Sequence, residues 1–525
     1  NTAVGWHAGM NITTGGSNVI VGSYAGDAMT TGDTSVIVGA QAGGSITIGK
    51  NNIAIGYNAL TQVTTAGGNV AVGREALENN GVDNNTAFGN WALHTNSTGY
   101  SNVGVGASAL ESNTTGFQNV AVGMLALRDN TTAQRCNAFG FYALASNTTG
   151  NYNNAFGTWA LDANSTGSRN VAMGYAALTD SQSNDNTAVG FEAGYVISTG
   201  YSNTAIGAYA LHTGTNDNNN TAIGFEALKN STADSTVAVG SKALKANTSG
   251  AENCAVGTNT LTANTTGSYN TACGINALDA NTTASKNTAV GYNASGSTTT
   301  GANNVAVGAN ALRDITDAVD CVSVGTDSMI EATGGSNTAV GNIAGYTVTT
   351  GAANVFLGNQ AGRNQVTTSN DNLYIANSST AAGSANTWIY GNSSGACYQG
   401  NNSSSWSTTS DRRLKKNIVN NNVGLAEINQ LRVANFEYRT EDEIDMSEFP
   451  LADGSHQVVL GGKEGKIYTG VIAQEIESVI PECIKVSDRG AKTVDTDPIM
   501  WAMVNAIKEL STKNDELAAE IATLK

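Results

Sequence analysis

The sequence predicts a mainly β protein: a long β-solenoid of about 22 seventeen-residue repeats, followed by a small α+β domain that ends in a helix. A short motif ending in glycine recurs at a fixed spacing along most of the chain. The repeat then disappears near residue 410, where charged and aliphatic residues become frequent. We therefore expect a shaft over 1–358, decayed repeats with a cap and a linker over 359–409, and a separate domain over 410–525.

The composition excludes several classes of protein. The 525 residues include 61 Gly and only 3 Pro, and 13% are charged, whereas typical globular chains carry about 25% charged residues and about 7% Gly. The net charge of −17 repels phosphate backbones, so nucleic acid is not an expected partner. No apolar run approaches the roughly 20 residues of a membrane span, so we expect no membrane insertion. Asn1 already lies within a repeat, so an anchor or attachment segment that precedes it would not be visible.

The repeat is built on the motif Asn-Thr/Val-Ala-Val/Ile/Phe-Gly, as in Asn1–Gly5, Asn119–Gly123 and Asn337–Gly341. Its final glycines run from Gly5 to Gly358 in 22 copies, at steps of 16 or 17 residues. An Ala-Leu pair and an Asn-Thr-Thr-Gly-like stretch usually follow. We interpret each unit as two short strands and two turns, which make one coil of a solenoid. Coils stacked at about 4.7 Å would give a shaft roughly 100 Å long.

Strand alternation predicts which side chains are inside. Positions 2 and 4 of the motif share one face, and we expect this Val/Ile/Phe face to form the thin core. The Ala and Gly positions would then form a smooth outer face that lets strands pack around a shared axis. The repeated Asn is expected to form ladders or to cap turns. A coil this thin buries little area alone, so we expect chains to associate.

The unit Asn-x-Ala-Val/Ile-Gly-x-x-Ala resembles the head repeats of trimeric autotransporter adhesins, which are parallel β-rolls. The resemblance covers roughly residues 1–360, although the family's repeats are usually shorter than 17 residues. It implies a homotrimer and a binding role.

Other functions of the shaft find less support. A glycan-degrading spike needs clustered Asp/Glu pairs, and acidic residues here are sparse. His7, His94 and His212 stand singly and are interpreted as surface substitutions. Ice binding needs flat arrays of Thr, but the strand Thr alternates with Val and is expected on the core face. We expect no cofactor and no metal.

The six cysteines are scattered, with no pair at metal-ligand spacing. We interpret them as buried free thiols. They are Cys136, Cys254, Cys273, Cys321, Cys397 and Cys483.

The repeat decays after Gly358. Asn372–Ala376 and Asn386–Gly391 are interpreted as worn copies, and larger aromatic residues appear. These aromatics are expected to cap the last coil, because open solenoid ends need covering; a sugar-binding tip is the alternative. They are Tyr374, Trp388, Tyr390, Tyr398 and Trp406.

The segment from Ser410 to Ile418 (Ser-Asp-Arg-Arg-Leu-Lys-Lys-Asn-Ile) resembles the start of the intramolecular chaperone auto-processing domain of phage tail spikes and fibres, including endosialidases. A second match is Gly-Val-Ile-Ala-Gln-Glu-Ile-Glu at 470–477, followed by Ile-Pro-Glu at 480–482, and a third is the closing helix from Asp497. Many relatives carry His shortly before this Gly, whereas Tyr468 and its neighbours stand here. His456 is a possible substitute within the polar insertion 440–466.

The resemblance implies self-cleavage between Thr409 and Ser410 after trimerisation, with Ser410 as the nucleophile and Lys415 as the general base. A serine hydroxyl needs a base to remove its proton. A lysine can act as that base only when it is neutral, which burial and neighbouring cations favour. Arg412, Arg413 and Lys416 are such cations.

The last helix carries a heptad seam over about 500–525. The seam consists of two heptad positions. One holds Met500, Ile507, Asn514 and Ile521, of which only Asn514 is polar, and the other holds Met503, Leu510, Leu517 and Leu524. The seam predicts a short coiled coil. Ile at one seam position with Leu at the other favours a coiled coil of two helices, whereas the resemblance implies an assembly of three chains.

These observations predict a structural fibre of a phage tail, assembled as a homotrimer by a self-cleaving C-terminal chaperone and located in the virion. Its expected partners are its own copies, other virion tail proteins and a host-surface glycan or protein receptor. The alternatives are a cellular surface adhesin and a glycan-degrading spike.

Overall fold

A computed structural model of the chain describes most of its residues. The described ranges are 1–363, 368–377, 387–393, 397–399, 412–439, 467–486 and 491–524. The chain divides into two compact units, Asn1–Ser404 and Ser405–Lys525. Each unit is described here by itself.

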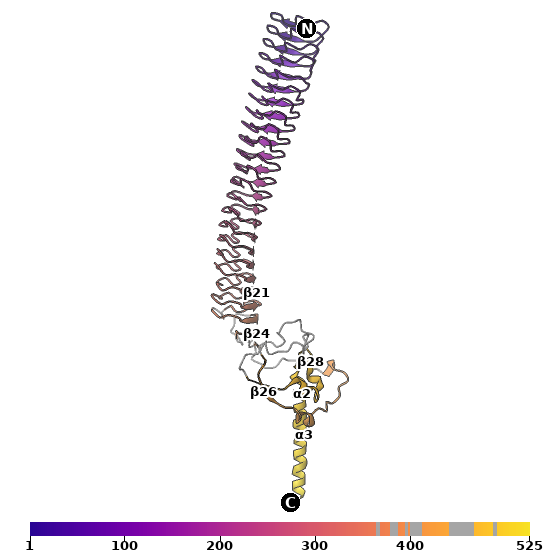
Figure 1. Cartoon of the computed structure of the whole chain (residues 1–525), viewed down its shortest axis with the longest axis vertical. Helices are drawn as coiled ribbons and strands as arrows, with labels where there is room; N and C mark the ends of the chain where they lie inside the picture. The colour runs from indigo at the N-terminus through magenta and orange to yellow at the C-terminus, as the bar shows by residue number, and fades with distance from the viewer. Residues whose placement is uncertain are drawn as a thin grey trace. The chain divides into compact units, whose positions relative to one another are not determined.

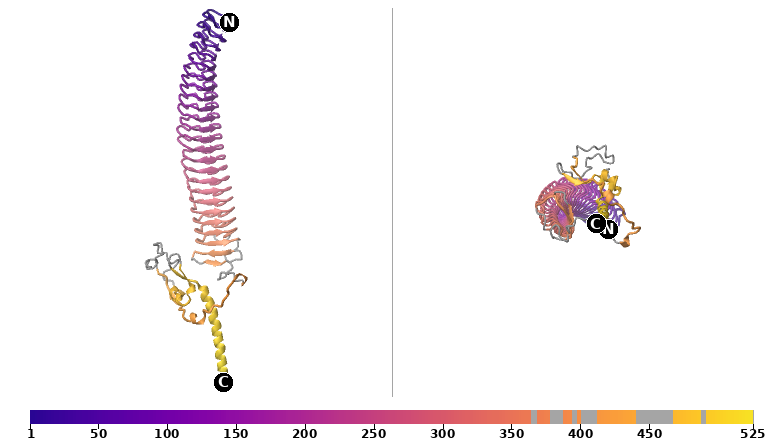
Figure 2. Two further views of the ribbon diagram at one scale, coloured as in Figure 1. Left: turned by 90° about the vertical axis from the view of Figure 1, so that its right-hand side faces the viewer. Right: turned by 90° about the horizontal axis from the view of Figure 1, so that it is seen from below.

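The first unit is a β-solenoid, and the prediction of about 22 coils is confirmed (Figure 1). Each coil contributes one three-residue strand that pairs in parallel with the strands of the neighbouring coils. Adjacent strands stack in register, so that Ala121 of one coil lies against Ala138 of the next. Figure 2 shows the coils as a gently curved column.

The strands of the solenoid are β1 Thr2–Val4, β2 Val19–Val21, β3 Val36–Val38, β4 Ile53–Ile55, β5 Val70–Val72, β6 Thr86–Phe88, β7 Val103–Val105, β8 Val120–Val122, β9 Asn137–Phe139, β10 Asn154–Phe156, β11 Val171–Met173, β12 Thr187–Val189, β13 Thr204–Ile206, β14 Thr221–Ile223, β15 Val237–Val239, β16 Cys254–Val256, β17 Thr271–Cys273, β18 Thr288–Val290, β19 Val305–Val307, β20 Val322–Val324, β21 Thr338–Val340 and β22 Val355–Leu357.

The prediction of a second strand in each coil is wrong. The Ala-Leu stretch is a turn, in which the leucine adopts a left-handed backbone; Leu127, for example, has φ of 51°. Its N–H donates to the carbonyl of Ala143 in the next coil at 3.0 Å. Backbone hydrogen bonds to the adjacent coil therefore continue through this turn, and the leucine side chain is buried in the core.

The predicted orientation of the strands is also wrong. From β2 to β22 the central residue of every strand is buried, while the residues on either side are exposed or half-buried. The core therefore consists of the central Ala, the Ala-Leu pair and a row of Asn. The Val/Ile/Phe residues face outward, because the space inside a 17-residue coil suits small residues on the strand side. Position-2 Thr also faces outward, so the reason given against ice binding fails, although that row still mixes Thr with Val and Asn.

Asparagine ladders hold the coils together, as predicted. The side-chain oxygen of Asn119 accepts the backbone N–H of Cys136 at 2.9 Å, and its amide donates to the Ala133 carbonyl at 2.9 Å. A second row runs beside it, in which Asn130 donates to Asn113 at 2.6 Å. These amides satisfy buried backbone groups that no strand reaches.

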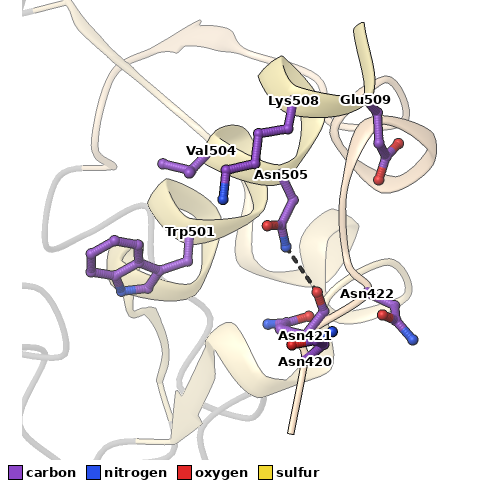
Figure 3. A pocket seen from close by; sticks show the side chains of 8 residues that line it. All are labelled: Asn420, Asn421, Asn422, Trp501, Val504, Asn505, Lys508 and Glu509. Atoms are coloured by element: carbon purple, nitrogen blue, oxygen red, sulfur yellow. Dashed lines mark hydrogen bonds between the residues drawn. The ribbon is translucent and has the colours of Figure 1, made fainter. Parts of the chain in front are cut away.

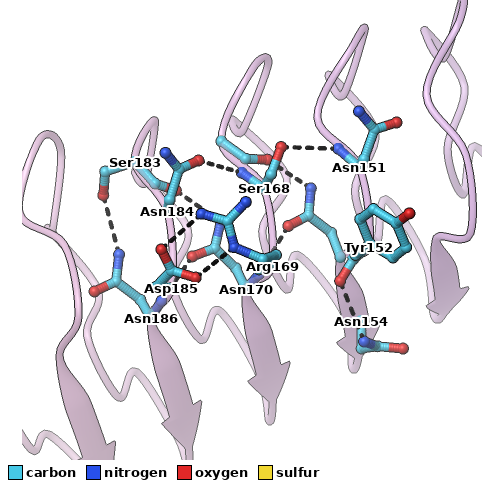
Figure 4. A network of polar contacts seen from close by, with 12 residues as sticks. Asn151, Tyr152, Asn154, Ser168, Arg169, Asn170, Ser183, Asn184, Asp185 and Asn186 are labelled. Carbon is cyan, nitrogen blue, oxygen red and sulfur yellow. Dashed lines mark hydrogen bonds and ion pairs between the residues drawn. The ribbon is translucent and has the colours of Figure 1, made fainter.

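Polar side chains on the surface of the solenoid also form contacts from one coil to the next. In Figure 4, Ser168 donates its backbone N–H to Asn184 at 2.7 Å, and Arg169 forms a paired contact with Asp185 at 2.6 and 2.8 Å. Each contact joins one coil to the next.

The motif glycine is required by both backbone conformation and space. Gly123 has φ of 138°, and a Cβ there would lie 2.4 Å from the carbonyl oxygen of Gly140 in the following coil. Any other side chain would separate the coils, which explains why this position is constant.

All six cysteines are free, as predicted, but only three are buried. Cys136 and Cys321 replace Asn in the first ladder, and burial raises the pKa of the Cys136 thiol to about 11. Cys273 and Cys397 are exposed and Cys254 is half-buried.

The end of the solenoid is closed by aromatic residues. β23 (Leu373–Ala376) extends the parallel ladder, and Tyr374, only 8% exposed, stacks on Phe356 with ring centres 5.7 Å apart. β24 (Thr387–Gly391) and β25 (Cys397–Gln399) then pair antiparallel. The second worn copy is therefore part of a meander and not a further coil. Trp388 is exposed, while Trp406 lies outside the described residues.

The second unit is a small α+β domain. Its elements are η1 Arg412–Leu414, α1 Leu425–Ile428, β26 Ala434–Phe436, β27 Tyr468–Gly470, α2 Ala473–Glu477, η4 Pro481–Cys483, β28 Ile484–Val486, β29 Lys492–Val494 and α3 Thr496–Thr523. β26 pairs with β27 and β28 with β29, both antiparallel. A small core of Ile476, Ile480, Cys483 and Ala502 joins α2, η4 and α3.

Candidate functional site

The predicted cleavage residues are only partly described. Thr409 and Ser410 lie outside the described residues, while Lys415 directly follows η1. Its backbone N–H donates to the carbonyl of Arg412 at 3.2 Å, and Lys415, Arg412 and Arg413 are all exposed. The structure thus places the predicted base on the surface of a single chain, next to the cations that the sequence indicated.

Apolar side chains around this segment are also exposed. Leu414, Ile418 and Val419 project from the stretch that follows the predicted cleavage position. Aliphatic residues clustered on a surface mark an interaction site more often than a solvated one.

The second motif connects a strand to a helix. Its first residue, Gly470, ends β27, and residues 473–477 form α2. Glu475 of this helix forms an ion pair with Arg432, which lies close to β26 in the sequence. This guanidinium holds the pKa of Glu475 below its usual range. Tyr468, which stands near the position of the relatives' His, packs against Tyr438 with ring centres 5.0 Å apart. His456, the possible substitute, lies outside the described residues.

Helix α3 begins where the resemblance predicted, within one residue. Asp495 is its N-cap, and its carboxylate accepts the N–H of Asp497 at 3.2 Å. The predicted heptad residues lie on this helix, except Leu524, which is its C-cap, and the apolar seam is exposed in the single chain. The helix is thus confirmed, and its pairing with other copies stays a prediction.

A groove lies between the start of α3 and the segment 420–422 (Figure 3). Its volume is about 590 Å³. Asn505 donates to the carbonyls of Asn421 and Val423, both at 3.0 Å, and so fixes one wall. Trp501 is exposed at its edge. No sequence motif marks this groove, because its two walls come from segments that are joined by hydrogen bonds across 82 and 84 residues of sequence.

Two histidines of the shaft are not isolated, which corrects their interpretation as single surface substitutions. His94 contacts Glu78 at 2.8 Å, and His212 contacts Glu192 at 3.0 Å. Each glutamate lies in the coil before that of its histidine. Glu75 lies close enough to His94 and Glu78 for the three to hold a metal ion. The indole N–H of Trp91 donates to Glu75 at 2.5 Å and lowers its pKa. These contacts are typical of polar ladders between coils.

The fold therefore defines a class: a repeat-built β-solenoid shaft joined to a small α+β domain with a long terminal helix. Residues 410–485 match the family model described as chaperone of endosialidase. Together with the β-solenoid, this match supports the resemblance to an endosialidase-type tail fibre with a C-terminal chaperone domain. No curated protein and no solved structure matches the chain. Within the described parts of the chain, no helix is both long and apolar enough to cross a bilayer.

Proposed function

We propose that the chain is a structural fibre of a phage tail, assembled as a homotrimer by its C-terminal domain, which then cleaves itself from the shaft. The observation that carries the proposal is the match of residues 410–485 to the chaperone of endosialidase. A domain of this kind is expected beside a repetitive shaft, whose 22 similar coils offer many registers that differ by one coil.

The strand face of the solenoid supports association of chains. The residue before each motif glycine is apolar in every coil from Val4 to Leu357, and none of these residues is buried. The result is an uninterrupted apolar row along the whole shaft. Monomers rarely leave a contiguous apolar surface of this extent in water. Packing three chains through this face would cover it without further change of fold.

The C-terminal helix supports the same arrangement. The exposed seam of α3, which includes Ile507 and Leu510, would be buried in a parallel bundle. Three copies joined there would begin with equal register, and the shafts would then associate coil by coil. The helix thus supplies the nucleus that the shaft's own repeats cannot specify.

Cleavage would follow from chemistry at the linker. The Ser410 hydroxyl attacks the Thr409 carbonyl while Lys415 takes its proton, and the acyl group moves from the Ser410 nitrogen to its oxygen. Water then hydrolyses the ester, which releases one chain ending at Thr409 and another beginning at Ser410. Lys415 is exposed in the single chain, so packing of neighbouring copies around it would supply the burial that favours its neutral form. Cleavage is therefore coupled to assembly.

The cleavage step is tested by intact-mass analysis of the purified wild type, Ser410→Ala and Ser407→Ala. We expect wild type and Ser407→Ala to give fragments that meet at Thr409 and Ser410. Ser410→Ala should stay whole, with cleavage reduced at least a hundredfold. If all three proteins remain full length, self-cleavage is rejected and the domain acts as an assembly template alone.

The mature shaft would attach the virion to a host surface through a glycan or protein receptor. A rigid column with a polar, variable outer surface suits this role, since the positions beside the strand face change from coil to coil more than the core rows do.

A further inference from the structure

One coil of the shaft carries a small residue where its neighbours carry large ones. Ala176 takes the position that Trp159 holds in the preceding coil and Glu192 in the following one. The missing side chain leaves a recess of about 250 Å³ with Ala176 in its wall. This volume lies below the roughly 300–1,000 Å³ typical of drug-sized ligands, so the recess suits one ring-sized or head-group-sized moiety.

Aromatic rings form much of the wall. Trp159 and Tyr175 meet with ring centres 5.3 Å apart at an angle of 66°, and they are 37% and 40% exposed. Tyr175 in turn stacks on Phe191 at 5.1 Å. Tyr195 lines another part of the recess. The contacts with Trp159 and Phe191 restrain the ring of Tyr175, so the aromatic wall is in place before a ligand binds.

Carboxylates supply the polar part of the wall. One oxygen of Asp162 is buried and has no hydrogen-bond partner among the described residues. Burial raises the pKa of this carboxyl, and the charge of Asp180 adds to the effect. Glu192 lines the same recess and contacts His212. The described lining includes no lysine or arginine, so the wall of the recess carries acidic groups and no basic side chain.

We propose that this recess binds an organic ammonium group, held over the faces of Trp159 and Tyr175 and opposite the carboxylate of Asp162. Cations are attracted to aromatic faces, and aromatic cages recognise quaternary ammonium groups in this way. The inference rests on the proposed attachment function and names the chemistry of the receptor. The group could belong to a choline-type head group or to the free amine of an amino sugar.

Calorimetric titration of the purified full chain distinguishes these sources. Choline is compared with its uncharged isostere 3,3-dimethylbutan-1-ol, and glucosamine with glucose. We expect choline or glucosamine to bind at least tenfold more tightly than its uncharged counterpart, and the one that binds identifies the source. Equal binding of charged and uncharged probes, or binding of none, would overturn the proposal.

Two variants locate the binding. Ala176→Tyr fills the recess and should fold, because Tyr142 and Tyr209 hold the same position in other coils with φ of 57° and 58°, close to the 52° of Ala176. Asp162→Asn removes the charge. We expect each to weaken binding at least tenfold, whereas Asp279→Asn, which changes a partly buried carboxylate at the equivalent position of a distant coil, should not. Unchanged binding by Ala176→Tyr would reject this site.

The outcome is separable from that of the proposed function. A chain that binds choline but neither trimerises nor cleaves would contradict the fibre assembly and leave the recess intact. A trimeric, self-cleaving chain that binds none of the probes would contradict the recess alone.

Discussion

Two substituted positions in one coil show how individual residues maintain the solenoid core. Gly214 stands where the two adjacent coils have Ile197 and Ser231, and Asp217 stands where they have Gly200 and Ala233. A Cβ on Gly214 would lie 2.8 Å from the Asp217 carboxylate. The carboxylate of Asp217 therefore occupies the space that a side chain at position 214 would take. The exchange keeps the volume of the core but places an ionisable group inside it.

The Asp217 carboxyl should make this coil sensitive to pH. It is 1% exposed, both of its oxygens lack hydrogen-bond partners among the described residues, and burial together with the charge of Asp234 raises its pKa to about 7. Because the folded pKa lies above the unfolded value of 3.8, the stability it contributes is full below about pH 4 and is lost as pH rises through about 7.

We predict that Asp217→Asn stabilises the coils around it at pH 8 by up to about 4 kcal/mol, at roughly 1.4 kcal/mol per pKa unit, with little change at pH 4. Solenoids open locally, so amide hydrogen exchange over 200–236 is the suitable measurement. A difference in protection between wild type and variant that is the same at both pH values would contradict this account.

At the scale of elements, the sequence predicted that each repeat forms one coil, but it did not predict which side chains of the coil are buried. The period of 17 residues, the parallel stacking and the Asn ladders follow from repetition and from side-chain chemistry alone. The orientation of the strand did not, because alternation defines two faces without saying which is buried. The second strand was predicted wrongly for another reason. The leucine of the Ala-Leu pair lies in a turn with a left-handed backbone, as Leu127 does with φ of 51°, and apolar composition does not reveal this conformation.

The cleavage segment has a similar limit. Ser410 and Lys415 were identified through resemblance, since a serine five residues before a lysine carries no geometry by itself. The recess at Ala176 was not predicted either. Its sequence signal is a small residue between the large Trp159 and Glu192 of the adjacent coils, which becomes visible when the repeats are aligned on their glycines.

Helix α3 provides the test of assembly at the scale of one element. We predict that Ile507→Asp reduces the fraction of assembled chains at least tenfold, since it places a charge within the apolar seam. Ala519→Asp adds the same charge at a position outside both seam rows and should assemble normally. The assembled fraction is measured by size-exclusion chromatography. Equal behaviour of the two variants would show that the seam is not an interface.

For the whole molecule, the solenoid explains how a chain with few bulky apolar residues folds. Each coil buries Ala, Leu and Asn against the next, so stability grows with the number of neighbours and not with the thickness of a core. The strand face is apolar surface that the fold of one chain leaves exposed, and we propose that other chains cover it. Removal of the chaperone after assembly would make unfolding slow to reverse, because the nucleus for register is lost.

The account depends most directly on the number of chains in the assembled protein. Sedimentation equilibrium of the Ser410→Ala protein, which keeps every chain whole, measures that number. We predict a single species of three times the chain mass of 53.6 kDa, independent of loading concentration. A species of one chain mass, with the apolar strand face left in water, would contradict the central claim.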